Sequence, residues 1–324
     1  MDLSTVFCAL LGLILLGIGG DVLVRGAVGL AELLKVSPLF TGLVLGGFGT
    51  STPELVTSLS AALQGSPGIA IGNIIGSNIA NTLLILGLTA IILPIPADPR
   101  SFRRDAPMLA IATLVCLAVV ETSSVGRLSG ALFLLLLAGY LWHTYRMEKQ
   151  RHDAPALLHE QQGRLLEPAA RSGALSAILA LSGLAGILVG ANLLVTASIQ
   201  IAAALGIPDS IIGLTVVAVG TSLPELATSV AAAVKRQTDI ALGNIIGSNI
   251  FNILGILGTT ALVRPIRIPD NVVDFDAWVL FGVTGLLLYY ALSEARISRS
   301  EGAVFLLLYA AYLVLLASRV LGAT

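Results

Sequence analysis

Charged residues are scarce in this chain of 324 residues, because Asp, Glu, Lys and Arg make up only 11% of it, whereas about a quarter of an ordinary soluble domain is charged. The net charge is −1, which gives no basic surface for binding nucleic acid. Cys8 and Cys116 stand alone in apolar runs, with no metal-ligand spacing and no nearby His. These shortages argue against a soluble globular fold, a nucleic-acid-binding protein, a disulfide framework and a cysteine metal site.

Apolar residues make up 56% of the chain, and the mean hydropathy is +0.94. Apolar runs of about 20 residues, long enough to cross a hydrocarbon layer of roughly 30 Å, recur along its whole length. They lack the alternation of a membrane barrel, so we expect an all-α integral membrane protein in a lipid bilayer. The runs predict ten transmembrane helices near residues 3–34, 38–64, 67–93, 105–122, 127–147, 172–205, 208–234, 239–263, 273–293 and 300–320.

The Lys and Arg residues indicate the orientation in the membrane. With the N-terminus outside, thirteen of them fall in cytoplasmic connections and four on the opposite side. Because cytoplasmic loops are usually the more positive, the sequence predicts a multi-pass protein of the cell (inner or plasma) membrane with both termini outside. The polar stretch 148–171 is then a cytoplasmic linker.

An internal repeat is the strongest signal in the sequence. Residues 49–87 align without gaps to residues 220–258, and 25 of the 39 positions are identical. Because each unit contains five predicted helices, an odd number, the second copy must be inverted in the membrane. The sequence therefore predicts a first repeat at 1–147 and a second, inverted repeat at 172–324, with a substrate site near the bilayer midplane where they meet.

The repeated block contains two acidic residues, Glu54 and Glu225. Thr50 precedes Glu54 by four residues and Thr221 precedes Glu225 by four, so each pair shares one face of a helix. A carboxylate near the bilayer centre costs at least ~2.5 kcal/mol, so an acid there is expected to serve a pathway or a bound ion. A purely structural Glu is the alternative, and Arg25 is its possible partner.

A proline precedes each of these acids. Pro53 and Pro224 lack a backbone N–H, so each is expected to kink its helix and free a carbonyl about one turn earlier. We expect those carbonyls, around Gly47 and Ala218, to be candidate ion ligands.

The run GNIIGSN is present in both copies. Its glycines, Gly72 and Gly76 in the first copy, are expected to permit close helix contact. Serine and asparagine side chains offer neutral oxygens on one helix face, namely Ser77 and Asn81 in one copy and Ser248 and Asn252 in the other. The remaining amides, Asn73, Asn78, Asn244 and Asn249, are expected to form hydrogen bonds between helices.

The candidate centre contains only oxygen donors: two carboxylates, hydroxyls, amide oxygens and carbonyls. Such a shell suits Ca²⁺ or Na⁺, whereas zinc or copper prefers nitrogen or sulfur. The run GNIIGSN also lacks the GK[ST] ending of a phosphate-binding loop, which argues against a nucleotide site. No pair of nucleophile and base lies near the carboxylates in the sequence, so we do not expect an enzyme. We expect a transporter that needs no cofactor and no obligatory protein partner.

These paired blocks, GTSxPE and GNxxGSN, closely resemble the cation/calcium exchanger superfamily, in particular the prokaryotic sodium/calcium exchangers. The resemblance implies the sodium/calcium exchanger fold and an antiporter that exchanges Ca²⁺ for Na⁺ by alternating access. It also implies that Glu54 and Glu225 form the calcium-chelating pair. Other positions that match the family's ion sites are Thr50, Ser51, Ser77, Asn81, Thr221, Ser222 and Ser248, with carbonyls near Gly47 and Ala218.

One position departs from the resemblance, because Asn252 stands where sodium/calcium exchangers commonly have an acidic residue. The shell charge is then −2, which neutralises one Ca²⁺ but leaves the counter-ion open. A proton/calcium antiporter on the same fold is the alternative, although the acidic motif usual in such exchangers is missing here. A cation channel is a second alternative, in which acidic residues line a pore.

Overall fold

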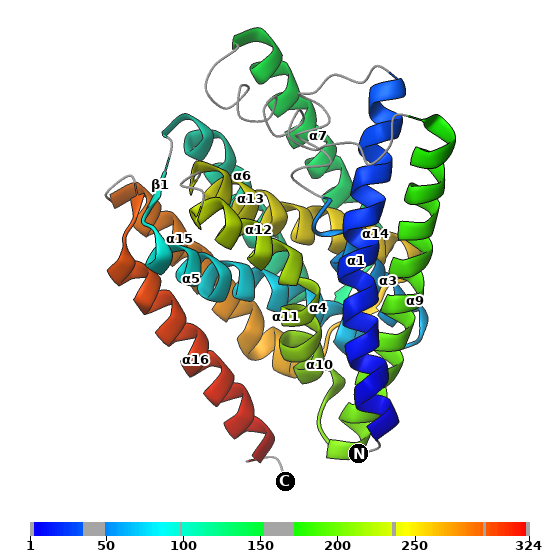
Figure 1. Ribbon diagram of the computed structural model, residues 1–324. Coiled ribbons are helices and arrows are strands. Elements are labelled where there is room, and N and C mark those ends of the chain that lie inside the picture. The colour runs from blue at the N-terminus through cyan, green and yellow to red at the C-terminus, as the bar shows by residue number, and fades with distance from the viewer. Residues whose placement is uncertain are drawn as a thin grey trace.

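The computed structural model describes residues 3–34, 49–97, 99–151, 172–234, 238–293 and 296–321. Within these residues the chain is helical except for turns, short connections and four strands of two residues each. Figure 1 shows two long helices, α1 (Leu3–Leu33) and α9 (Gly173–Leu205), side by side along one edge of the molecule, and α16 (Arg299–Leu321) along the opposite edge. The start of α1 and the end of α16 lie at the same end of the molecule, which we call the terminus end.

In the first half, one helix passes through a π-helical segment without a break, from residue 67 to residue 92. After α1, the described helices are α3 (Thr52–Leu63), α4 (Pro67–Ala80), the π-helical η2 (Asn81–Leu86), α5 (Gly87–Ile92), α6 (Pro99–Val120) and α7 (Arg127–Arg151). The strands are β1 (Ile95–Pro96) and β2 (Ser124–Val125).

The second half repeats this order. After α9 come α10 (Asp209–Ile212), η3 (Gly213–Val217), α11 (Ala218–Thr221), α12 (Leu223–Val234), α13 (Thr238–Ile250), η4 (Phe251–Leu257), α14 (Gly258–Val263), η5 (Val272–Asp276), α15 (Ala277–Ser293) and α16. The strands are β3 (Ile266–Arg267) and β4 (Arg296–Ile297).

Seven of the described helices are long and apolar enough to cross a membrane, and the bent pair 209–221 and 223–234 makes an eighth if it is one span. The helices that carry the GNIIGSN run lie in the centre of the molecule. The most apolar part of the helix at 67–92 is 83% buried, and that at 242–263 is 78% buried, against 28% for α1 and 33% for α9. The central position follows from the many small and apolar residues around the run, which let helices pack on every side.

Two helix boundaries differ from those expected. Helix α6 begins at Pro99, six residues before the predicted start at residue 105, because proline is well suited to the first turn of a helix. Helix α7 continues to Arg151, past the predicted end at residue 147, because Met, Glu, Lys, Gln and Arg all favour helix. Two segments lie outside the described residues. They are residues 35–48, which include the first part of the second predicted helix, and residues 152–171 of the predicted linker.

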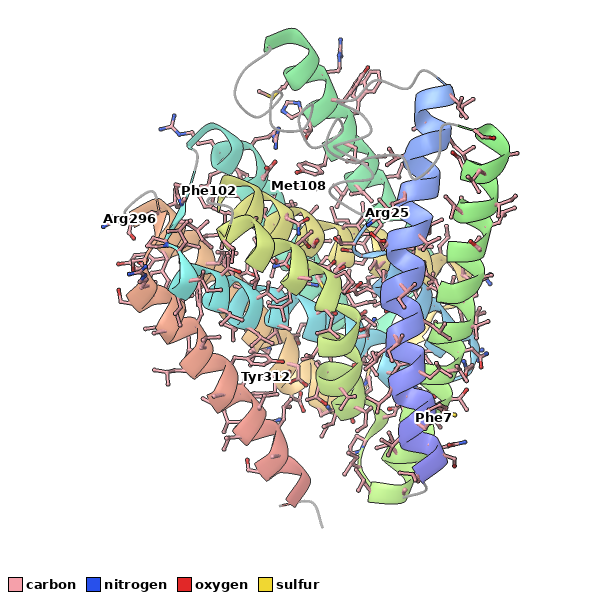
Figure 2. All side chains as sticks on the ribbon, in the orientation of Figure 1. Phe7, Arg25, Phe102, Met108, Arg296 and Tyr312 are labelled. Atoms are coloured by element: carbon pink, nitrogen blue, oxygen red, sulfur yellow. The ribbon has the colours of Figure 1, made fainter. Side chains whose placement is uncertain are left out.

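Glycines hold α1 and α9 together. A Cβ atom built on Gly12 would lie 2.8 Å from the carbonyl oxygen of Gly190, and one on Gly183 would lie 2.4 Å from the backbone nitrogen of Leu23. Only glycine permits backbones to come this close. The outward face of the pair is apolar and exposed, and Phe7 lies on it (Figure 2). The two long helices therefore form one unit with a face suited to lipid.

Two pairs of short strands join the two halves of the chain. β1 pairs antiparallel with β4, and β2 pairs antiparallel with β3, so each half contributes one strand to each pair. Buried Asp–Tyr hydrogen bonds repeat in the same way: Tyr140 donates to Asp105 at 2.9 Å, and Tyr312 donates to Asp276 at 2.9 Å. Figure 2 shows Tyr312 between α16 and the rest of the bundle. These contacts hold the outer helices against the centre.

Candidate ion-binding site

The two acids of the repeated motif each lie in the first turn of a short helix. Pro53 and Pro224 are the second residues of α3 and α12, a position where the missing N–H breaks no helical hydrogen bond. The expected interruption is present, since the chain bends by 42° at Ser222. Because the free N–H groups at a helix start favour negative charge, this placement stabilises the carboxylates of Glu54 and Glu225.

The structure brings the two acids together through reciprocal hydrogen bonds. The Ser51 hydroxyl donates to Glu225 Oε1 at 2.9 Å, and the Ser222 hydroxyl donates to Glu54 Oε1 at 2.9 Å. Both glutamates are 0% exposed. Since each serine precedes the glutamate of its own half by three residues, the two helix starts face each other with one carboxylate from each half between them.

Several oxygen atoms of the residues expected to form the site are buried and lack a hydrogen-bond partner. They are Glu54 Oε2, Glu225 Oε2, Thr50 Oγ1, Asn81 Oδ1 and Asn252 Oδ1. A buried polar group left unsatisfied costs about 1–3 kcal/mol, and more if it is charged. Their common property is that each can donate a lone pair to a hard cation, which is the chemistry expected from the sequence.

The serines of the GNIIGSN runs lie beside the same centre. The hydroxyl oxygens of Ser51 and Ser248 are hydrogen-bonded at 3.2 Å, and the Ser77 hydroxyl donates to the Ala218 carbonyl at 3.4 Å. This carbonyl also accepts the backbone N–H of Ser222 at 3.1 Å. The Ala218 carbonyl, an expected ligand, is therefore hydrogen-bonded in this conformation, and Gly47 lies outside the described residues.

The asparagines at equivalent positions of the two halves are held differently. Asn81 Nδ2 donates to Asn249 Oδ1 at 3.1 Å, and Asn249 Nδ2 donates to Thr82 Oγ1 at 3.0 Å. Asn252 is 1% exposed, and neither its nitrogen nor its oxygen has a partner. Asn249 and Thr82 thus orient Asn81 so that its free oxygen remains available, whereas nothing fixes the amide of Asn252.

Asn73 ties three helices together next to the acids. Its Nδ2 donates to the Glu54 carbonyl at 3.2 Å and to the Ser58 hydroxyl at 2.9 Å, while its Oδ1 accepts from Thr221 at 3.0 Å. The expected inter-helix hydrogen bonds of Asn73 and Asn249 are confirmed. The expectation for Asn78 is wrong, because its Nδ2 donates to Ile74 of the same helix at 2.7 Å, a local bond that small polar side chains often make.

No basic side chain among the described residues neutralises the two acids. Arg25, the possible partner, forms an ion pair at 2.9 Å with Asp21 on its own helix, and both side chains are more than half exposed. The described residues also contain no cluster of three His, Cys, Asp or Glu side chains that could hold a metal ion. The centre thus has two carboxylates surrounded by neutral oxygens, an arrangement suited to a hard cation with a small charge.

Sequence reasoning did not identify two hydroxyls that hold the asparagines of the site in place. Ser58 accepts a hydrogen bond from Asn73, and Thr82 accepts one from Asn249, which in turn holds Asn81. The repeat carried part of this signal, because Ser58 recurs as Ser229 at the same spacing of 171 residues. Nothing in the sequence indicated the π-helical segments η2 and η4, which begin at or next to Asn81 and Asn252. Segments of this kind are frequent at functional sites.

Comparison with known proteins gives one consistent result. The family model described as sodium/calcium exchanger protein matches residues 4–146 and 175–317. CaxA of Alkalimonas amylolytica is 39% identical and covers 98% of this chain and 100% of its own length. The sodium/calcium exchanger MaX1 of Methanosarcina acetivorans is 35% identical and covers 95% of this chain and 97% of its own.

A solved structure of the sodium-calcium exchanger NCX_Mj, soaked with Na⁺ and Sr²⁺, has a similar fold. It is 34% identical, covers 97% of this chain and 99% of its own length, and has a TM-score of 0.62. The family match spans both halves of the repeat, and the structural match spans the whole bundle. The chain is therefore an all-α membrane protein that belongs to the sodium/calcium exchanger family, of the prokaryotic type.

Proposed function

We propose that this protein is a secondary active antiporter that exchanges Ca²⁺ for Na⁺ at a site built from Glu54 and Glu225. The observation that carries the proposal is the reciprocal pair of bonds from Ser51 and Ser222, which holds one acid from each half in a fully buried centre. Unpartnered oxygens of the acids and of Thr50, Asn81 and Asn252 complete an oxygen shell. Ca²⁺ takes six to eight such oxygens.

The charge of the centre explains why two ions would exchange. Two carboxylates give −2, which one Ca²⁺ or two Na⁺ ions neutralise. Both ions need oxygens of the same two acids, so the binding of one displaces the other. The hydroxyls of Thr50, Thr221, Ser77 and Ser248 and the carbonyls of Gly47 and Ala218 are further proposed ligands.

We propose that the chain forms ten transmembrane helices as two inverted five-helix repeats, 1–147 and 172–324, joined by a linker at 148–171. The exchange of contacts between equivalent residues supports this arrangement, since Ser51 contacts Glu225 as Ser222 contacts Glu54. The distribution of Lys and Arg favours both termini outside and the linker in the cytoplasm. Access to the site would alternate as α1 and α9, packed together through glycines, move across the central helices.

The test is calcium uptake into proteoliposomes with imposed sodium, potassium or proton gradients, each applied separately. An outward sodium gradient is expected to drive uptake, and neither of the others should do so. Uptake that ignores sodium but follows a proton gradient would overturn the sodium version in favour of proton coupling. Uptake that no gradient accelerates and that does not saturate with calcium would indicate a channel.

A further inference from the structure

Two identical asparagines at equivalent positions of the repeat have different contacts. Asn73 on α4 is 0% exposed and makes the three inter-helix hydrogen bonds described above, to Glu54, Ser58 and Thr221. Asn244 on α13, which lies 171 residues later, is half-buried and makes no hydrogen bond within the described part of the chain, so the inter-helix bond expected for it is absent from this conformation. The asparagine of the first copy therefore ties three helices together as a clamp, whereas the asparagine of the second copy ties none.

The partners that Asn244 needs are nevertheless present, one in each half. Ser229 is the equivalent of Ser58, and Thr50 is the equivalent of Thr221. Both hydroxyls are buried without a hydrogen-bond partner, although Thr50 lies beside the Glu225 carboxylate. Because unpartnered buried hydroxyls are costly, a conformation in which Asn244 joins them is favoured locally. The chain thus carries a complete second clamp whose parts are separated here.

The glycines next to Asn73 are closely packed, whereas the glycine next to Asn244 is not. A Cβ atom on Gly72 would lie 2.6 Å from the Ser210 carbonyl oxygen, and one on Gly76 would lie 2.6 Å from that of Leu214, so α4 is packed tightly against α10 and η3. The equivalent Gly243 on α13 is exposed. In Figure 1, α10 lies near the terminus end and α13 toward the opposite end. Among the described residues, packing is close beside Asn73 and more open beside Asn244; residues 38–46, at the repeat spacing from α10 and η3, lie outside the described residues.

From these contacts we propose that Asn73 and Asn244 are alternate clamps that close the ion site from the terminus end and from the opposite end, one at a time. Here the Asn73 clamp is made. In the opposite conformation Asn73 releases Thr221 and Ser58, while the Asn244 amide donates to Ser229 and to the Glu225 carbonyl and accepts from Thr50. Both are positioning residues, since neither needs to touch the ion. The inference deepens the proposed function and rests on it for the two-sided access of the site.

A cysteine substituted for Gly243 reports which clamp is made, because Gly243 is exposed only while the Asn244 side is open. In full-length protein with Cys8 and Cys116 replaced by alanine, the Gly243→Cys reporter is reacted in detergent with a charged thiol reagent, and the labelling rate is measured. Asn73→Ala is expected to shift the equilibrium between the two conformations about fivefold to thirtyfold away from the present one, the effect of losing one or two net hydrogen bonds, and so to slow labelling by up to that factor. Ser58→Ala is expected to act in the same direction, and it decides the matter if Asn73→Ala does not fold.

Two matched controls separate the clamp from a general loss of structure. Asn78→Ala removes an amide of the same helix that bonds only to its own turn, and Ser229→Ala removes a hydroxyl that has no partner here. Both should stay within about twofold of the parent, and Asn244→Ala should not slow labelling. A rate for Asn73→Ala and Ser58→Ala equal to that of Asn78→Ala would overturn the clamp. Labelling needs no ion gradient, so failure of calcium uptake by the parent would remove the antiport proposal and leave this result standing.

Discussion

The two halves of the molecule agree at the paired acids of the proposed ion site and differ around them. Glu54 and Glu225 each accept a bond from a serine of the opposite half at the same distance, 2.9 Å. The buried aspartates of the flanking helices are not so well matched. Asp105 is paired with Arg104 at 2.6 Å and with Tyr140, whereas Asp276 is bonded to Tyr312 alone and one of its oxygens has no partner.

A single substitution within the repeat explains the flanking difference. Phe275 stands where the first half has Arg104, and the nearest described cation, Arg319, lies 3.9 Å over the Phe275 ring. Residues that face an ion reached from both sides must present the same chemistry in each half. Residues that only hold helices together are free to diverge. Matching contacts in the two halves are therefore expected where residues contact the proposed ion.

The largest effect is expected at the acids. Glu54→Gln and Glu225→Gln should each reduce sodium-driven calcium uptake at least a hundredfold, since a unit charge about 4 Å from a carboxylate gains roughly 4 kcal/mol at an effective dielectric constant of about 20. Uptake into proteoliposomes measures this, with Glu121→Gln, an exposed residue at the end of α6, as the matched control. Normal uptake by either variant would break the equivalence of the two halves and remove the proposed centre.

Substitutions at Asn252 and Asn81 test whether the two halves contribute equally to ion binding. Asn252→Asp would change the charge of the centre from −2 to −3, so calcium should bind about tenfold tighter, and the sodium dependence of calcium displacement should become steeper, from two toward three sodium ions. Displacement of radiolabelled calcium by sodium measures both quantities. The equivalent change in the first half, Asn81→Asp, should have the same effect, and a response from only one of the two would show that the halves contribute unequally.

The flanking aspartates are expected to respond in opposite ways. Asp105→Asn removes a carboxylate that forms an ion pair with the Arg104 guanidinium, which is 10% exposed, and should lower the free energy of unfolding by about 3 kcal/mol. Asp276→Asn keeps an acceptor for Tyr312 and removes a carboxylate that forms no ion pair in the described part of the chain, so it should change stability by less than about 1 kcal/mol or increase it. Thermal unfolding in detergent compares them. Equal destabilisation would show that Asp276 is also neutralised.

The smallest effect concerns the contact between α1 and α9. Gly183→Ala should cost about 1–3 kcal/mol, because its Cβ would overlap the backbone nitrogen of Leu23. Gly17→Ala is the control, since a Cβ there meets nothing within 4 Å. The same unfolding measurement distinguishes them. If Gly183→Ala is as stable as Gly17→Ala, the two helices are not held by close backbone contact.

Much of the fold and of the site could be predicted from the sequence, because the features depend on local pattern. Long apolar runs gave the helices, and the glycines gave close contacts such as that of Gly72 with Ser210. The repeat gave the pairing of equivalent acids as an expectation. The prolines correctly indicated where the chain is interrupted, although the Ala218 carbonyl expected to be freed there is hydrogen-bonded to the backbone of Ser222.

Other features depend on how the halves meet, which a local pattern does not contain. The bond from Ser51 to Glu225 crosses from one half to the other, and no spacing within a half predicts it. The local bond of Asn78 to Ile74 competes successfully with the inter-helix bond expected for it. Asn73 and Asn244 lie in the same sequence, GNIIGSN, so their different contacts describe a conformation and could not be read from the residues.

The exchanged strand pairs have a consequence for the history of the chain. Because β1 pairs with β4 and β2 pairs with β3, neither half satisfies its own strand edges. A protein consisting of one half alone would need a second copy of itself, inserted upside down if the proposed inversion holds, to complete both pairs and both serine–glutamate bonds. An ancestral homodimer with dual orientation meets that requirement, and gene duplication followed by fusion would produce the present chain.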